Sequence, residues 1–256
     1  MNIIVVIKHI PNLADDLELN DEGTNLEFDE IDFVINEFDE HAVEQAVLLK
    51  EANGGNVTVL GVDLIEELDG VLHTALAKGA DKAVKIAGDL EPGIDSHTQA
   101  FWLSEVIREM DADIVLTGVQ AADDLDGQIG PMLAAHLDIP YLGVVTGVEV
   151  AHRVATLYKE FAGGVLGKYT VSLPVVVGVQ AAQNPPRYAP ISKVRQIAKT
   201  VEINEIEIDD EGPGAGLTLR RMSPPVSAGH AEMLGGDAEE VAAKIIETIE
   251  ERGLIK

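Results

Sequence analysis

The sequence predicts an α/β fold with a mainly parallel sheet and helices on both of its faces. Short apolar runs rich in Val and Ile alternate with segments of helical periodicity through the first 140 residues. Successive parallel strands need crossover connections, which such helices supply. The strand runs are apolar at consecutive positions, as expected of strands buried on both faces. With 256 residues, 46% of them hydrophobic, the chain is long enough for one large domain, alone or with an appendage.

The first elements follow directly from local patterns. Residues 2–7 form a continuous β-branched run, which predicts a buried opening strand. Residues 16–30 alternate loosely around Asp21-Glu22-Gly23, which indicates a hairpin. Apolar residues from Phe38 to Leu49 have helical spacing, and Gly54-Gly55 ends that helix before a strand at 57–62.

The alternation continues to residue 137. Helices are predicted around 64–75 and 100–110 and at 128–137, with strands at 83–87 and 113–118. The rhythm then changes to four strand-like stretches at 142–150, 153–161, 165–172 and 174–180, with turns at His152 and Gly163-Gly164. Short connections join antiparallel strands, so an antiparallel edge on the sheet is expected here.

The chain changes character beyond about residue 190. An acidic stretch at 202–211 and the break Gly212-Pro213-Gly214-Ala215-Gly216 precede an apolar stripe from Ala238 to Ile249 on a terminal helix. We therefore expect an α/β domain at 1–190 and an appended arm at 191–256. The stripe needs a surface to cover it, either the core of the chain itself or a partner subunit.

Charge and composition exclude several classes of function. The chain has 18 basic and 45 acidic residues, a net charge of −27, so it repels a phosphate backbone and a nucleic acid is not an expected partner. The acidity is spread along the chain, as on proteins of salt-loving microbes. The absence of cysteine excludes disulfides and thiolate chemistry. The apolar runs are too short to span a bilayer, and a soluble cytoplasmic protein is expected.

Neither a metal site nor a catalytic residue is predicted. The seven histidines show no metal-ligand spacing, and no G-x-S-x-G nucleophile elbow is present. Residues 163–168 superficially match a phosphate-binding loop. Ala162 replaces its first glycine and Tyr169 its Ser or Thr, and the context is a hairpin.

A first candidate site lies where the parallel strands end. Lys8, Asp63 and the run Gly118-Val119-Gln120 follow three predicted strands, and ligands of open α/β sheets bind at such ends. The loop that follows, 121–132, carries Gly127 and Gly130, which allow a close approach of backbone to ligand.

The loop also carries three aspartates, Asp123, Asp124 and Asp126. They would repel an adjacent phosphate, so they either cap backbone amides or hold a ribose; simple helix caps are the plainer alternative. A second candidate site is 184–199, where no acidic residue occurs from Arg187 to Thr200 and prolines stiffen the chain. This segment is either an exposed recognition loop or a solvated basic helix end.

Six segments in order resemble the β subunit of electron transfer flavoprotein, the FixA-like family. They are IIVVIKHIP at the start, INEFDEHAVEQAVLLKE at 35–51, TALAKGADKAV at 74–84, LTGVQAADDLDGQIGPMLAAHLDIP at 116–140, a GG with LPVVVGV at 163–179, and NPPRYAPI at 184–191. The resemblance implies a Rossmann-like fold of the adenine-nucleotide α-hydrolase-like type. It also implies an α subunit as partner, which carries the redox FAD, and an arm at 191–256 that packs on it.

The resemblance assigns the site residues as well. The implied nucleotide pocket comprises Val6, Lys8, Asn36, Glu37, Phe38, Asp39, Asp63, Asp123, Asp124, Asp126, Gly127, Gln128, Ile129, Gly130, Pro131, Met132, Leu133 and Ala134. Phe38 is expected near the α-subunit flavin, and Leu13 stands where many relatives have an aromatic residue. The recognition loop for partner dehydrogenases falls on 184–195. Its implied partner-binding residues are Arg187, Tyr188, Ile191, Lys193 and Arg195, with Ile191 in place of the anchoring leucine.

The resemblance leaves the pocket's ligand open between AMP and a second FAD. The run Gln128-Ile129-Gly130-Pro131 with Leu137-Asp138-Ile139-Pro140 is closer to the group that holds a second FAD and bifurcates electrons from NADH. The implied function is electron transfer from flavin dehydrogenases toward a membrane quinone oxidoreductase, without bond-making chemistry in this chain. Two alternative functions are a universal-stress-type nucleotide sensor and an adenylating enzyme, which would need glycines where His9-Ile10-Pro11-Asn12 stands.

Overall fold

A computed structural model describes residues 1–28, 31–88, 90, 94–208, 212–214, 219–224, 231 and 233–255. The chain divides into two compact units, Met1–Met222 and Ser223–Lys256. The first unit holds a seven-stranded sheet in the order β12-β5-β4-β1-β6-β11-β7, and every pairing in it is parallel. Its strands are β1 (Asn2–Val6), β4 (Asn56–Val62), β5 (Lys82–Ala87), β6 (Ile114–Gly118), β7 (Tyr141–Val145), β11 (Val175–Val179) and β12 (Asn204–Glu207).

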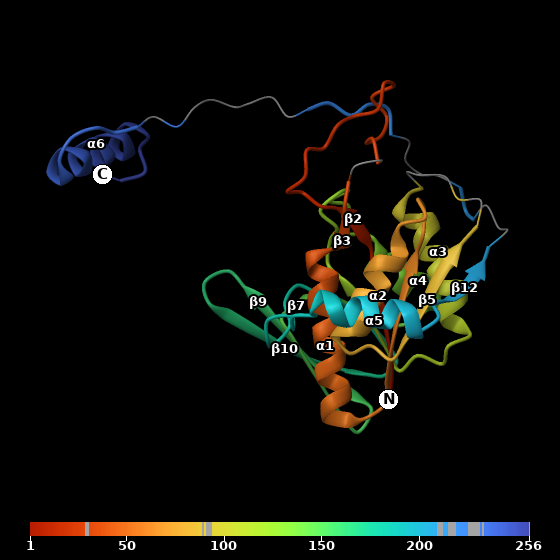
Figure 1. Ribbon diagram of the computed structural model, residues 1–256. Helices are drawn as coiled ribbons and strands as arrows, with labels where there is room; N and C mark the ends of the chain where they lie inside the picture. The colour runs from red at the N-terminus through yellow and green to blue at the C-terminus, as the bar shows by residue number, and fades with distance from the viewer. Residues whose placement is uncertain are drawn as a thin grey trace. The chain divides into compact units, whose positions relative to one another are not determined.

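Helices cover both faces of this sheet, as predicted (Figure 1). One face carries α1 (Glu37–Asn53) and α2 (Leu68–Lys78), and α5 (Ile191–Thr200) packs on α2. The other face carries α3 (Ser96–Arg108) and α4 (Ile129–Leu137), which pack against each other. Most of the connections between its strands return through a helix, whereas β7 connects to its parallel neighbour β11 through three antiparallel strands.

The alternation of side chains along the strands divides the interior into two cores. Ile3 and Val5 of β1 face α1 and α2, whereas Ile4 and Val6 face α3 and α4. All four side chains are at most 7% exposed, so the central strand is apolar throughout because both of its faces are buried. Glycine ends the first helix as predicted, since Gly54 has a φ of 71° that disfavours other residues.

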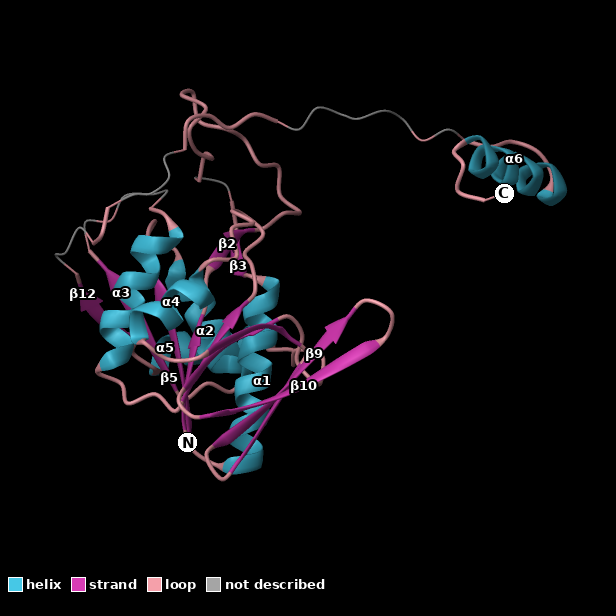
Figure 2. Cartoon of the chain, turned by 180° about the vertical axis from the view of Figure 1, so that it is seen from behind, coloured by secondary structure: helices cyan, strands magenta, loops and turns pink. Residues whose placement is uncertain are grey.

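The expected antiparallel edge of the main sheet is wrong in its placement. The antiparallel strands β8 (Gly147–Ala151), β9 (Val154–Phe161) and β10 (Val165–Ser172) form a sheet of their own. The predicted single stretch 142–150 is two strands, because the chain leaves the main sheet at Thr146, two residues after Val144 with its φ of 62°. The β9–β10 hairpin extends away from the central sheet (Figure 2).

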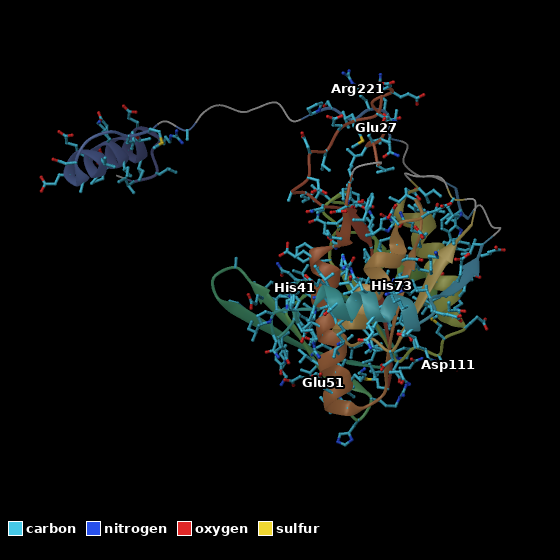
Figure 3. The ribbon with its side chains drawn as sticks, in the orientation of Figure 1. Glu27, His41, Glu51, His73, Asp111 and Arg221 are labelled. Atoms are coloured by element: carbon cyan, nitrogen blue, oxygen red, sulfur yellow. The ribbon has the colours of Figure 1, made fainter. Side chains whose placement is uncertain are left out.

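Two shorter features adjoin this framework. β2 (His9–Pro11) pairs antiparallel with β3 (Phe33–Ile35), directly after β1. The hairpin expected at 16–30 is present in minimal form, with a single antiparallel bridge between Leu19 and Leu26 and a hydrogen bond from the amide of Glu27 to the carbonyl of Glu18; Asp29 and Glu30 lie outside the described residues. Glu27 and Arg221 are labelled in this region in Figure 3, where the amide of Met222 donates to the carbonyl of Gly23.

The chain beyond 190 takes part in the first unit, in contrast to the expected boundary. α5 packs on α2, and β12 pairs with β5 at the edge of the sheet. The second unit contains α6 (Ala238–Glu251), which Asp237 caps by accepting from the amides of Glu239 and Glu240. On α6, Ile245 is 45% exposed and Ile246 is 50% exposed. The apolar stripe is thus a feature of a separate unit that starts at Ser223.

Candidate functional site

A pocket opens where the strand order of the main sheet reverses direction. β4 lies on one side of β1 and β6 on the other, so two crossovers leave β1 and β6 in opposite directions. Such switch points are where open α/β sheets bind ligands, at the carboxyl ends of the strands. The pocket contains about 450 Å³ of empty space, part of which is open to solvent. Its lining consists of Val6, Ile7, Lys8, Asn36, Asp39, Ser96, Gln99, Thr117, Gly118, Val119, Gln120, Ala121, Asp124, Gly127, Gln128 and Ile129.

Asp39 joins the two strand ends that flank the pocket. Its carboxylate accepts hydrogen bonds from the amide of Lys8 (2.9 Å) and from the amide of Gly118 (2.8 Å). A methyl group on Gly118 would lie 2.2 Å from Oδ1 of Asp39, so only glycine permits this approach. α1 therefore places one side chain, 6% exposed, that fixes the distance between β1 and β6.

The surroundings of Asp39 affect its protonation. Burial disfavours the charged form, whereas the hydrogen bonds from Lys8, Gly118 and Asn36 favour it. Burial outweighs these hydrogen bonds, and the pKa of Asp39 rises from an ordinary 3.8 to about 7. The wall of the pocket thus contains a carboxyl group whose pKa is close to neutral pH.

Lys8 closes the pocket on the side of the 120–128 loop. Its ammonium group lies 2.8 Å from Asp123 and 2.7 Å from Asp124. Burial opposes the charge on Lys8, but the two carboxylates outweigh that effect and raise the pKa of Lys8. The repulsion that the aspartates would exert on a phosphate is thereby partly neutralised by a lysine of the neighbouring strand.

The aspartates organise the loop and do not cap α4. Oδ1 of Asp124 accepts from the amide of Asp126 at 2.9 Å, whereas the N-cap position of α4 is Gln128. The side chain of Asn36 donates to the carbonyl of Gln120 at 2.8 Å, so α1 also holds the start of the loop. Gly127 has a φ of 65°, which suits glycine at the turn into the helix.

The residues of the pocket fit a polar ligand. Among the described residues, Oγ1 of Thr117 is a buried polar atom without a hydrogen-bond partner, on the floor of the pocket at the end of β6. Buried hydroxyl groups are normally satisfied, so this atom has unused capacity for a ligand or water. Gln99 and Ser96 at the start of α3 add further polar groups. This set of neutral donors and acceptors suits the base and sugar of a nucleotide.

Comparison with known proteins identifies the family. Residues 25–211 match the electron transfer flavoprotein domain. The chain is 32% identical to electron transfer flavoprotein subunit beta of Methylophilus methylotrophus, over 98% of both chains. The chain belongs to the electron transfer flavoprotein family. Electron transfer flavoprotein subunit beta of Bacillus subtilis is 31% identical over 96% of both chains, and that of Thermoanaerobacterium thermosaccharolyticum is 28% identical over the full length of both. The family resemblance read from the sequence is confirmed, and the universal-stress-type alternative is not favoured.

For this electron transfer flavoprotein chain, the structure brings together part of the predicted nucleotide set. Val6, Lys8, Asn36, Asp39, Asp124, Gly127, Gln128 and Ile129 line the pocket. The remaining predicted residues do not line it: Glu37, Phe38, Asp63, Asp123, Asp126, Gly130, Pro131, Met132, Leu133 and Ala134. Of these, Leu133 and Ala134 pack in the core between α4 and the sheet. Asp63 accepts from the amide of Glu67 at 3.1 Å and so shapes the turn before α2.

Several pocket residues were absent from the predicted set. Thr117 is the last but one residue of a buried strand, and Ser96 and Gln99 open a helix that is distant in sequence. The sequence predicts the run 118–120 as the end of a strand, but no sequence pattern predicts the hydrogen bond from the amide of Gly118 to Asp39. A polar Thr within an otherwise apolar strand run is the one feature that could have indicated Thr117.

The second predicted site, 184–195, lies on the side of α1 and α2. Tyr188 is 80% exposed and Ile191 is 64% exposed, and Ile191 begins α5. Arg195 is exposed on α5. Arg187 and Lys193 differ from the free surface cations expected from sequence, since both bind groups of α1 or α2. Leu13, in its separate loop, is 63% exposed. No helix in the described ranges is both long and apolar enough to cross a membrane.

Proposed function

We propose that this chain is the β subunit of a heterodimeric electron transfer flavoprotein that accepts electrons from flavin dehydrogenases and delivers them toward a membrane quinone oxidoreductase. The observation that carries the proposal is the pocket at the β1–β6 switch point, in a chain that aligns from end to end with proteins named as β subunits. The chain supplies a nucleotide site and docking surfaces. The FAD bound with the α subunit supplies the electron-transfer chemistry.

The pocket is proposed to hold an adenine nucleotide, either AMP or the adenylate part of a second FAD. The unpartnered hydroxyl of Thr117 and the amide side chains of Gln99 and Asn36 are suited to the base and ribose. Lys8 is the one cation lining the described pocket, and two carboxylates already engage it. This limited positive charge is better matched to a single phosphate than to several. The 128–131 loop sequence points the other way, to a second FAD and with it bifurcation from NADH, so the ligand analysis described below decides between AMP and FAD.

Two further surfaces complete the proposal. The segment 184–195 is proposed to dock flavin dehydrogenases, supported by the exposed side chains of Tyr188 and Ile191. The terminal unit is proposed to bury the stripe of α6 on the α subunit, supported by the half-exposed Ile245 and Ile246. A cytoplasmic location fits these partners.

The test is to purify the complex of this chain with its α subunit and identify the ligands released on denaturation. Visible spectra and mass spectrometry are expected to give one FAD plus either one AMP or a second FAD per heterodimer. Reduction of the bound flavin by a cognate dehydrogenase should then require both chains. A complex that carries a single FAD and no second nucleotide would contradict the role proposed for the pocket.

A further inference from the structure

Arg187 lies in a segment without helix or strand, yet its backbone and its side chain both form hydrogen bonds with α1 or α2. Its amide and its Nε both donate to Oε2 of Glu44 at 2.9 Å, and a guanidinium NH₂ group donates to Oε1 of Glu44 at 2.9 Å. A second guanidinium nitrogen donates to Glu51 at 2.9 Å. Glu44 and Glu51 lie about two turns apart on α1, so one side chain bridges two successive turns of that helix (Figure 3 labels Glu51).

The pair of Arg187 with Glu44 is buried on the glutamate side. Glu44 is 4% exposed, and although burial opposes its charge, the hydrogen bonds and charge of Arg187 lower its pKa. Lys78 of α2, 6% exposed, donates to the carbonyl of Arg187 and also pairs with Glu40 at 2.6 Å. The backbone amide, the carbonyl and the side chain of Arg187 are thus all bound.

Contacts on either side of Arg187 attach the rest of the segment. The amide of Ala182 donates to Nδ1 of His41 on α1 at 3.2 Å. Nζ of Lys193 donates to the carbonyl of Ala77 at 2.6 Å, in the last turn of α2, where a cation is favoured by the helix dipole. The segment 182–193 is therefore fixed at three places, although residues 182–190 contain no helix or strand.

What this fixed segment presents outward is an aromatic and an aliphatic side chain. Tyr188 directly follows Arg187, and Ile191 comes three residues later, at 80% and 64% exposure. Tyrosine is enriched among the residues that dominate binding energy. Side chains held in place before binding lose less conformational entropy on binding.

We infer that Arg187 and Glu44 are positioning residues that hold Tyr188 and Ile191 in a binding-ready arrangement for the dehydrogenase. The inference rests on the proposed docking function of 184–195. In this role Arg187 acts through the forked shape of its guanidinium group. In the alternative role it would steer the partner by long-range attraction, which depends on its charge alone. The two roles differ in what a lysine at this position would do.

The test is the substitution Arg187→Lys in the purified heterodimer, since it keeps the charge and removes the fork. The KM for the cognate dehydrogenase is expected to rise about tenfold, with kcat at saturation unchanged. Arg153→Lys, at a turn where Arg153 pairs with Asp113 at 2.8 Å, is the matched control and should behave as wild type. Hydrogen exchange of amides 182–190 should accelerate in Arg187→Lys while the amides of the central sheet do not change.

A double-mutant cycle with Ile191→Ala separates the possible outcomes. If Arg187 acts by positioning Ile191, the loss caused by Ile191→Ala becomes smaller in the Arg187→Lys background. A KM within twofold of wild type for Arg187→Lys, while Ile191→Ala raises KM, would overturn this inference and leave the docking function intact. This inference would also be overturned if the fold-changes in KM of the two single variants simply multiplied in the double variant. An unchanged KM for Ile191→Ala would overturn the docking function itself. If Arg187→Lys assembles poorly with the α subunit, Glu44→Gln, which keeps the shape of Glu44, replaces it in this test. Glu44→Gln is expected to raise the KM in the same way.

Discussion

Gly118 is the residue at which the smallest chemical change should most disturb the nucleotide pocket. A Cβ at this position would lie 2.2 Å from Oδ1 of Asp39 and 2.9 Å from its amide, so Gly118→Ala must displace the side chain that joins β1 to β6. We expect a loss of about 1–3 kcal/mol in the free energy of unfolding, the range for overpacking. Urea denaturation measures it.

Gly70→Ala is the matched control for this substitution. Gly70 lies in α2 with no atom within 4 Å of an added Cβ, and alanine is favoured over glycine in a helix by roughly 0.5–1 kcal/mol. The two glycine-to-alanine changes should therefore shift stability in opposite directions. Equal changes in the free energy of unfolding would contradict the steric clash that the structure places at Gly118.

Asp39 should make stability depend on pH. Its folded pKa of about 7 lies above its ordinary 3.8, so between these values the folded state binds more protons than the unfolded state. The free energy of unfolding should therefore fall as pH rises from about 4 to 7, by up to about 4 kcal/mol from this group. Asp39→Asn cannot titrate and should have a shallower slope over this window. Parallel pH profiles for the two proteins would contradict the raised pKa.

At the residue scale, the sequence predicts which residue types lie at the site better than it predicts which of them contact each other. Lys8 and the aspartates of the loop were expected at one crevice because parallel strands end at a common edge. That Lys8 pairs with Asp123 and Asp124 depends on the positions of two strands more than 100 residues apart in sequence. The same holds for Thr117 and Gln99, which read as ordinary strand and helix residues until the fold places them in the pocket.

At the scale of elements, the order of the helices and of the parallel strands follows from periodicity, but their pairing does not. The apolar run of β1 and the glycines after α1 and α2 have local signals. The division of 142–150 between two sheets has none, because both halves are rich in valine and glycine and no turn residue separates them, although the backbone of Val144 has a φ of 62°. The entry of β12 into the main sheet was also missed, since its acidic sequence Asn-Glu-Ile-Glu indicates solvent rather than an edge strand.

The helix α6 provides the test of the terminal unit. Ile245→Asp should weaken assembly with the α subunit at least tenfold, or about 1.4 kcal/mol, because an unpaired charge would be buried in an apolar contact. Ala243→Asp adds the same charge two residues away, about 200° around the helix, and should leave assembly unchanged. Size-exclusion chromatography over a dilution series measures both. Intact assembly of Ile245→Asp would assign the stripe to contacts within this chain.

At the scale of the whole molecule, the charge of −27 should make stability depend on salt. The 18 basic residues can neutralise at most 18 of the 45 acidic ones one to one, so 27 carboxylates repel one another. The Debye length falls from about 10 Å at 0.1 M salt to about 3 Å at 1 M, which screens that repulsion. The Tm should rise with KCl. A Tm that does not change between these concentrations would contradict the interpretation of the acidic composition as that of a protein from a salt-loving microbe.

The measurement that most directly tests the central claim is calorimetric titration of the nucleotide-free heterodimer with AMP. We expect one site per β chain, with binding weakened at least tenfold by Gly118→Ala and unchanged by Gly70→Ala, since only the first substitution lies at the β1–β6 switch point. A protein whose pocket belongs to a second FAD should bind FAD at the same site and with the same dependence on Gly118. Equal nucleotide affinity in wild type and Gly118→Ala would show that the nucleotide binds elsewhere and would contradict the account.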